Sequence, residues 1–476
     1  MSGNAGTPKG PAPNEVTQGE SLYRKEPKVY PRDVSGRYAR LRKIAVFALL
    51  GLYYVLPWLE IGGYQAVLFD LPARRFHVLG FTFWPQDFIY LALLLICAGL
   101  SLFFFTALAG RLWCGYACPQ TVWTETFLWM ESWVEGDRNK RMKLDKSPWN
   151  ANKIWRKSLK QFLWIGFALW TGFTFVGFFT PIREFGANLL AWNIGPWETF
   201  WWLFYALATY GNAGYLREQV CKYMCPYARF QSAMFDRDTL VISYDAERGE
   251  PRGGRRKTDD PKEKGLGDCI SCTLCVQVCP TGIDIRNGLQ YECIACAACI
   301  DVCDQVMDKM GYEPGLIKYT TENALEHKKS RILRPRVVIY GVLLVAILGG
   351  IFLSLMDRVP LRAELIRDRN ALYRELRDGR VENIYTLKLI NMTEQTHRYR
   401  ITVPAHPELE LTVRPEPVLT PERVGEFSLS LRADQDFGRG SVEVTVRFES
   451  EDDPNLAIER TTRMLMPFEG SGGGQP

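Results

Sequence analysis

Long runs of apolar residues constrain the fold of this chain more than any other feature of its sequence. Four runs each approach the ~20 residues that an α-helix needs to cross the hydrocarbon core of a bilayer. A fifth run is weaker, because it contains Asn212 and several small residues. The runs occupy residues 44–61, 88–109, 161–182, 199–216 and 337–356. A buried core helix is the alternative for each run, and it fits the weaker run best. The sequence therefore predicts an integral membrane protein with five spanning helices.

Lys and Arg residues are distributed unevenly among the segments that flank these runs. They are dense before the first run and throughout residues 111–160, whereas the loop after the first run has only Arg74 and Arg75, and the loop after the third only Arg183. Short loops rich in Lys and Arg stay on the cytoplasmic side of a membrane. Five spans with the N-terminus inside satisfy this rule at every short loop. The prediction places residues 217–336 in the cytoplasm and the chain after residue 357 on the outer side.

The cysteines support this topology independently. The chain has thirteen, and none lies in residues 60–87, 183–198 or 357–476, the segments assigned to the outside. Disulfides form in oxidising compartments, so cysteines clustered on the reducing side indicate metal ligands or redox groups. Cys97 stands alone inside the second run and is predicted to be a small buried apolar residue. The other cysteines form four short motifs.

Two consecutive motifs with the spacing C-x2-C-x2-C-x3-C give the strongest signal for chemistry. A [4Fe–4S] cluster takes three thiolates from one such motif and the fourth from the other. Zinc modules are the alternative, but they separate two cysteine pairs by a longer spacer. Residues 265–311 are therefore predicted to form a two-cluster, ferredoxin-like α+β domain. The first cluster is assigned to Cys269, Cys272, Cys275 and Cys303, and the second to Cys293, Cys296, Cys299 and Cys279.

A second pair of motifs repeats the pattern C-x3-C-P, at Cys114 and Cys118 and again at Cys221 and Cys225. Each follows a run that leads from the outside to the inside, so both are expected near the cytoplasmic surface. Residues four apart lie on one face of a helix, and the proline marks the end of that helix. Four thiols could therefore converge on copper, zinc or iron–sulfur. Cysteines that only pack or cap remain the alternative.

The remaining segments differ again in composition. Residues 245–268 are rich in Gly, Pro and charge, which predicts a flexible linker or long loop. Residues 361–380 read as a charged helical stalk. From about residue 381 to 468, short stretches alternate apolar and polar residues, which predicts a small β-sandwich. His397 and His406 are interpreted as plain surface residues of that sandwich.

The predicted fold class is a multidomain membrane protein with α-helical spans, a ferredoxin-like α+β domain and an immunoglobulin-like β-sandwich. Its parts are a cytoplasmic tail (1–43), a four-span membrane domain (44–217), a cytoplasmic linker (218–264), the ferredoxin domain (265–311), a fifth transmembrane helix (337–356), and a stalk with a periplasmic immunoglobulin-like domain (357–476).

Taken together, these motifs resemble the cytochrome c oxidase accessory proteins called CcoG, FixG or RdxA. The resemblance covers nearly the whole chain after the first forty residues. The membrane and ferredoxin parts also resemble NapH-type quinol dehydrogenase subunits, whereas the outer sandwich favours the CcoG family. What the resemblance implies is reduction of Cu(II) to Cu(I) for assembly of cbb-type cytochrome c oxidases in the inner membrane of a Gram-negative bacterium. Copper ion, copper chaperones and oxidase assembly factors are the implied partners.

Three functional hypotheses follow. The first is an enzyme, a cupric reductase that uses two [4Fe–4S] clusters and holds copper at Cys114, Cys118, Cys221 and Cys225. The alternative is an electron-transfer subunit that passes electrons from quinol or a soluble reductase to a partner complex. A scaffold with structural clusters is the third. No nucleotide-binding glycine motif is evident, so a separate electron donor is expected. The net charge of +5 is too weak to indicate nucleic acid.

Overall fold

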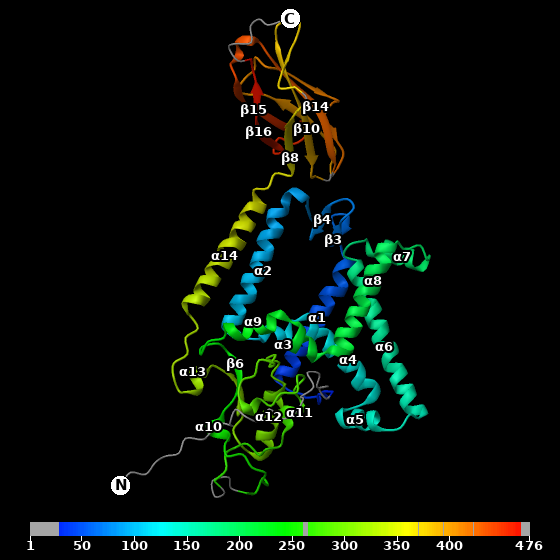
Figure 1. The fold of residues 1–476 in the computed structure, drawn as a ribbon, viewed down its shortest axis with the longest axis vertical. Coiled ribbons are helices and arrows are strands. Elements are labelled where there is room, and N and C mark those ends of the chain that lie inside the picture. The colour runs from blue at the N-terminus through cyan, green and yellow to red at the C-terminus, as the bar shows by residue number, and fades with distance from the viewer. Residues whose placement is uncertain (1–27, 260–264, 370, 394, 422, 468–476) are drawn as a thin grey trace, which may run out of the picture. The chain divides into compact units, whose positions relative to one another are not determined.

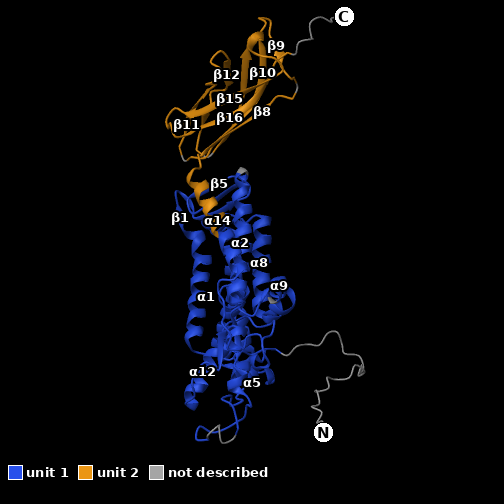
Figure 2. Cartoon of the chain, turned by 90° about the vertical axis from the view of Figure 1, so that its left-hand side faces the viewer, with its two compact units in different colours: residues 1–344 blue, residues 345–476 orange. Residues whose placement is uncertain are grey.

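The computed structural model describes residues 28–259, 265–369, 371–393, 395–421 and 423–467. The chain divides into two compact units, residues 1–344 and residues 345–476, which are coloured separately in Figure 2.

Four helices of the described chain are long and apolar enough to cross a membrane, as Figure 1 lets the reader follow. Many of their apolar side chains are exposed, which is stable in lipid and costly in water. Cys97 is buried within the second of them, as predicted. The helices are α1 (Arg37–Val55), α2 (Phe88–Ala109), α6 (Ala151–Val176) and α14 (Pro335–Met356).

Two of these helices begin earlier than the apolar runs predict. Helix α6 starts ten residues before residue 161, because the side chain of Asn150 accepts a hydrogen bond from the backbone N–H of Lys153 at 2.8 Å. Helix α1 starts at Arg37, within the basic segment that precedes its apolar run. In both cases polar residues extend the helix beyond the apolar stretch that hydropathy detects.

The fifth predicted span is not confirmed. Residues 199–216 fall in α8 (Pro196–Thr209) and in a following π-helical segment, η3 (Tyr210–Leu216). Helix α8 has only 14 residues, too few to span a bilayer without that continuation. In η3, Gly214 lies against the ring of Trp164, where a Cβ would come within 3.2 Å. The five-span topology therefore stays a prediction.

Shorter elements connect the long helices of the first unit. Two small antiparallel sheets, which the sequence analysis did not predict, follow α1. They consist of β1 (Glu60–Ile61) and β2 (Tyr64–Gln65), and of β3 (Val67–Asp70), β4 (Arg75–Val78) and β5 (Phe81–Phe83). The helices are α3 (Leu112–Tyr116), α4 (Pro119–Glu135), α5 (Arg138–Lys146), α7 (Ile182–Leu190) and α9 (Pro226–Met234), with the π-helical segment η4 (Val220–Met224) before α9.

The ferredoxin domain repeats one local backbone conformation. The residues on each side of Cys272 and of Cys296 have positive φ, between 53° and 59°, so both motifs turn in the same way before their helices. The two helices are α11 (Leu274–Gln277) and α12 (Ala298–Met310). A two-stranded antiparallel sheet of β6 (Val241–Tyr244) and β7 (Ile317–Thr320) completes the domain, and Ile242 and Ile317 lie in its core.

Residues 245–268, predicted to be a flexible linker or a long loop, form a long loop in the described part of that segment, and contacts with neighbouring residues hold it in place. Strand β6 and the short helix α10 (Ala246–Gly249) both lie within residues 218–264, and Gly253 donates a backbone hydrogen bond to the carbonyl of Cys269 at 3.1 Å. A Cβ at Gly267 would lie 2.5 Å from the backbone of Gly249. Backbone hydrogen bonds and close glycine contacts, which composition does not reveal, fix this loop. Residues 260–264 lie outside the described chain.

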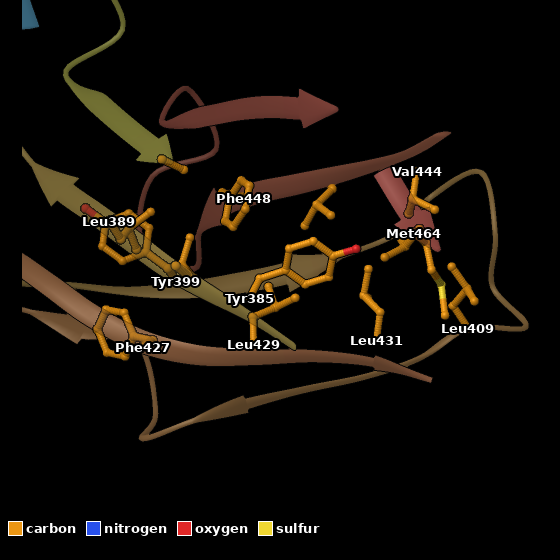
Figure 3. Packing of buried hydrophobic residues seen from close by; sticks show 14 of the residues in the cluster. Tyr385, Leu389, Tyr399, Leu409, Phe427, Leu429, Leu431, Val444, Phe448 and Met464 are labelled. Atoms are coloured by element: carbon orange, nitrogen blue, oxygen red, sulfur yellow. The ribbon is translucent and has the colours of Figure 1, made fainter. Parts of the chain in front are cut away.

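The second unit is a sandwich of two antiparallel sheets, as predicted. Figure 3 shows Tyr385, Leu429 and Phe448 pointing into the space between the sheets. One sheet has the order β12-β14-β10-β8, with β9 also paired to β10, and the other has the order β13-β11-β15-β16. The strands are β8 (Leu361–Arg367), β9 (Arg374–Glu375), β10 (Val381–Asn391), β11 (His397–Thr402), β12 (Glu410–Arg414), β13 (Val418–Leu419), β14 (Val424–Ala433), β15 (Ser441–Ser450) and β16 (Ala457–Leu465).

Two expectations for this unit are wrong. The predicted helical stalk is strand β8, because Leu361 and Ala363 alternate inward and are each only 2% exposed. Strand β8 pairs with β10, and this pairing provides hydrogen-bond partners for the backbone N–H and C=O groups of this charged stretch. His397 is not a surface residue. It is buried, and its Nδ1 lies 3.1 Å from the hydroxyl of Ser450.

Candidate iron–sulfur and thiolate sites

A first cavity in the ferredoxin domain gathers one of the predicted ligand sets. Cys269, Cys272, Cys275 and Cys303 all line it, so the structure brings together three cysteines of the first motif and the last cysteine of the second. The other walls are mostly apolar and include Met307. Four thiols around one mostly apolar cavity fit a [4Fe–4S] cluster, whose chemistry is one-electron transfer.

A second cavity gathers the other set in the same crossed manner. Cys279, Cys293, Cys296 and Cys299 line it, and Cys275 of the first set also reaches its wall. Burial raises the pKa of Cys293 to about 12, because a lone thiolate is poorly solvated in this cavity. Iron would compensate that charge, so this donor set fits a second cluster.

No three His, Cys, Asp or Glu side chains in the described part of the chain lie close enough to hold a single metal ion. Each cavity takes three cysteines from one motif and one from the other. This crossed arrangement is that of a two-cluster ferredoxin, whereas zinc modules separate two cysteine pairs by a longer spacer.

The two C-x3-C-P motifs have the same local fold. In each, the residue four positions before the first cysteine breaks the preceding helix with a positive φ: Gly110 has φ 55° and ψ −120°, and Arg217 has φ 43° and ψ −113°. Each motif then closes a wide turn across five residues. The N–H of Cys118 donates to the carbonyl of Trp113 at 2.9 Å, and that of Cys225 donates to Val220 at 2.8 Å. The sequence repeat is thus a structural repeat.

The second cysteine of each motif leaves the helical conformation. Cys118 has φ −62° and ψ 128°, and Cys225 has φ −79° and ψ 109°. The expectation of two thiols on one helical face is therefore wrong, because the following proline excludes the α region. That proline does not merely end a helix. Pro119 and Pro226 are the first residues of α4 and α9, a position that suits proline.

The four thiols of these motifs share one neighbourhood. Burial raises the pKa of Cys114 to about 12, and the charges of the other three thiols add to this effect. Burial likewise raises the pKa of Cys221 to about 11, with Cys118 and Cys225 contributing. The Cys114 thiol also donates to the side-chain oxygen of Gln231 at 3.4 Å. The structure therefore brings the four residues near one another without forming a tight site for one ion.

The first of these motifs contacts the ligand loop of the second cavity directly. A Cβ at Gly115 would lie 2.7 Å from the carbonyl oxygen of Ile294 and 2.9 Å from the Cα of Cys296. Only glycine allows this approach. The Cys114 side chain packs against the same cluster of residues, which includes Ile294 and Cys296. The sequence analysis did not predict this contact between two separate cysteine motifs.

Cationic side chains of the membrane domain hold the same loop. Arg42 of α1 is 8% exposed, and its Nη1 donates to the carbonyl of Cys296 at 2.7 Å. Arg111 donates to the carbonyls of Tyr291 and Ala228. In the sequence, both arginines were used only to assign the cytoplasmic side of the membrane. The sequence of a basic flank does not show which of its residues are solvated and which are buried.

A buried carboxylate supports the second C-x3-C-P motif. The side chain of Glu131 has no exposed surface and lies 2.6 Å from Arg217, with Lys28, Lys160 and Arg141 within 4 Å. Burial by itself would raise the pKa of Glu131, but these cations, Arg217 foremost, lower it to about 2. This network fixes Arg217, the positive-φ residue four positions before Cys221.

Comparison with known proteins agrees with these sites. The description "4Fe-4S dicluster domain" matches residues 216–322, "4Fe-4S binding domain" matches residues 90–141, and "IG-like fold at C-terminal of FixG" matches residues 351–467. The first two matches each include one C-x3-C-P motif. A crystal structure of a FixG-related protein from Vibrio parahaemolyticus is 30% identical over 22% of this chain and 96% of that chain, with a TM-score of 0.21.

Three relatives match most of the chain. Protein RdxB of Cereibacter sphaeroides is 41% identical over 84% of this chain and 87% of its own length. Nitrogen fixation protein FixG of Rhizobium meliloti is 37% identical over 82% of both chains, and protein RdxA of Cereibacter sphaeroides is 38% identical over 81% of this chain and 84% of its own. The chain belongs to the FixG/RdxA family. This member of the family is a membrane iron–sulfur protein that transfers electrons.

Proposed function

We propose that this FixG/RdxA protein is a cupric reductase that converts Cu(II) to Cu(I) for assembly of a cbb-type cytochrome c oxidase. The observation that carries the proposal is the contact of Gly115 with Ile294 and Cys296, because it sets a thiol pair beside the second cysteine cavity. Reduction of Cu(II) needs one electron and a soft site for the product, and thiolates are the ligands that Cu(I) prefers.

The proposed copper ligands are Cys114, Cys118, Cys221 and Cys225. The described residues form no site of three or more ligands for one ion. Cu(I), however, is stable with two thiolates, so one pair suffices. Burial raises the pKa of Cys114 and of Cys221, so binding of Cu(I) to these two thiols would release protons.

A second candidate function is electron transfer to a partner complex without copper. The match of residues 90–141 to a 4Fe-4S binding domain favours it, because that segment contains Cys114 and Cys118 but none of the ferredoxin cysteines. Under this alternative the four thiols would hold an iron–sulfur cluster.

The proposal includes a location and partners. The basic flanks of the membrane helices support a bacterial inner-membrane protein with a cytoplasmic ferredoxin domain and a periplasmic sandwich. Copper chaperones or oxidase assembly factors would receive the Cu(I).

The test is reoxidation of dithionite-reduced protein by Cu(II), with Cu(I) measured by a chelator. We expect the double variant C114S/C118S to reduce copper at least tenfold more slowly while its cluster spectra stay unchanged. C97A, which removes a buried thiol outside the motifs, is the matched control. Equal rates in the wild type and the double variant would exclude this thiol pair as the copper site.

A further inference from the structure

A pocket of about 430 Å³ lies where the membrane domain meets the ferredoxin domain within the first unit. The segment 29–34, helices α1 and α4, and the ferredoxin loops contribute its walls. Its volume is within the range of ~300–1,000 Å³ that small-molecule sites occupy. Nothing in the proposed function uses this pocket.

Both kinds of cysteine site reach the wall of this pocket. Cys296 of the second ligand set and Cys221 of the second C-x3-C-P motif both line it. The pocket therefore lies beside both candidate redox sites. A small electron donor or acceptor fits this position better than a ligand without redox chemistry.

The apolar side of the pocket leads to the membrane. Leu128 and Trp129 of α4 line it, and the Trp129 ring stacks on Phe47 with 5.6 Å between centroids. Phe47 is 67% exposed and lies in α1, a helix that is long and apolar enough to cross a membrane. An apolar, flat occupant could enter from the bilayer along these aromatic rings.

The polar side of the pocket contains groups suited to a hydroxylated ring. Glu125 lies 3.6 Å from the guanidinium of Arg42, which itself donates to the carbonyl of Cys296. Thr124 adds a hydroxyl to the same wall. A carboxylate can accept a hydrogen bond and then the proton of a ring hydroxyl, and the arginine beside it stabilises negative charge that develops on the ring oxygen.

We infer that this pocket binds a membrane quinol and that the quinol is the electron donor of the protein. The inference rests on the proposed function only for the acceptor, Cu(II). Oxidation of a quinol to a quinone breaks two O–H bonds. One proton would go to the carboxylate of Glu125 and the other to water. The two electrons would leave one at a time through the [4Fe–4S] clusters that the two four-cysteine sets would hold, and would reduce two Cu(II) ions to two Cu(I) ions.

The binding test uses the full-length protein and 2-heptyl-4-hydroxyquinoline N-oxide, a quinone analogue whose fluorescence is quenched when it binds. We expect one site per chain in the wild type, and at least tenfold weaker binding in T124W, which fills the pocket. I165W adds the same side chain at an exposed position of α6 and should bind as the wild type does. L128W is a second filling variant in case T124W does not fold. Equal binding by the wild type and a correctly folded filling variant would overturn the inference.

The functional test compares two electron sources for Cu(II) reduction. Short-chain quinol should drive the reaction at the same rate in the wild type and in I165W. In T124W and E125Q the quinol-driven rate, divided by the same variant's dithionite-driven rate, should be at least tenfold lower than in the wild type. Reduction by dithionite but not by quinol in the wild type overturns the quinol inference and leaves the copper proposal intact. If dithionite also fails, the copper proposal is wrong, and displacement of the bound analogue by quinol still decides whether the pocket is a quinol site.

Discussion

The carboxylate of Asp301 accepts hydrogen bonds from the backbone N–H groups of Tyr38 and Ala39, at 3.1 and 2.7 Å. Asp301 belongs to α12 of the ferredoxin domain, between two cluster cysteines, and the two amides are in the first turn of membrane helix α1. The first amides of a helix have no hydrogen-bond partner within it. A negative charge at this end also interacts favourably with the positive end of the helix dipole. A ferredoxin residue thus caps a membrane helix.

Removing this cap should loosen the junction between the two domains. We expect D301A to lower the free energy of unfolding by about 1–3 kcal/mol, since it leaves buried N–H groups without an acceptor. Thermal unfolding of detergent-solubilised protein is the measurement. D308A changes an exposed carboxylate on the same helix and should have no effect. Equal destabilisation by both variants would show that the cap contributes nothing specific.

Gly115 should be irreplaceable even by alanine. In G115A the new methyl group would collide with the carbonyl of Ile294, so the first C-x3-C-P motif must move away from the second cavity. We expect slower copper reduction with both clusters retained, measured by the chelator assay and by visible absorption. Gly99 of α2 has open space around it, so G99A should behave as the wild type. A G115A protein with the wild-type rate would remove the basis for electron transfer across this contact.

Iron analysis should distinguish the possible roles of the thiols. Two [4Fe–4S] clusters correspond to ~8 irons and ~8 acid-labile sulfides per chain. C272S should lose about half of this iron, because Cys272 lines only the first cavity. Mössbauer spectroscopy and iron determination provide the measurement. About 12 irons, falling to ~8 in C114S/C118S, would instead assign a third cluster to the C-x3-C-P motifs.

Glu131 should make stability depend on pH under acidic conditions. Its pKa is lowered from 4.5 to about 2 in the folded protein, so its contribution is fully present above pH 4.5 and is lost as the pH falls toward 2. The difference of 4.5 − 2 corresponds to roughly 3 kcal/mol. Between pH 5 and pH 2.5, the melting temperature should therefore fall more steeply with decreasing pH for the wild type than for E131Q. Parallel curves for the two proteins would contradict this ion network.

Reporter fusions should decide the topology. With five spans, a reporter after Arg256 is cytoplasmic and one after Ser471 lies on the outer side. If α8 and η3 do not span the membrane, the two locations exchange. Alkaline phosphatase and green fluorescent protein fusions at both positions are sufficient to distinguish these outcomes.

Several features could be predicted from the sequence because they depend on local patterns. The four long helices follow from apolar runs of the right length, and the strands of the sandwich from residues that alternate. The spacing of the cysteines was enough to predict both ligand sets that the cavities bring together. In each case the signal lies within a few turns or strands of the chain.

Local patterns gave wrong or incomplete predictions where the same composition is compatible with two different structures. Residues 361–380 carry enough charge to resemble a solvated helix, but β8 forms because β10 offers backbone partners and a core for Leu361 and Ala363. The loop around Gly253 resembles a flexible linker, but hydrogen bonds with the Cys269 region order it. Such partners are distant in sequence, so a window of residues does not contain them.

The working geometry of the redox sites was decided only by tertiary structure. Ala39 and Asp301 are 262 residues apart, and Arg42 and Cys296 are 254 apart. In the sequence, Asp301 is one of many carboxylates, Arg42 one of many basic residues near a membrane helix, and Gly115 an ordinary glycine. Spacing specifies which thiols can share a cluster, because neighbouring ligands are tied by a short stretch of backbone. Which arginine, carboxylate or glycine meets that cluster depends on how whole domains pack, and no local pattern encodes that.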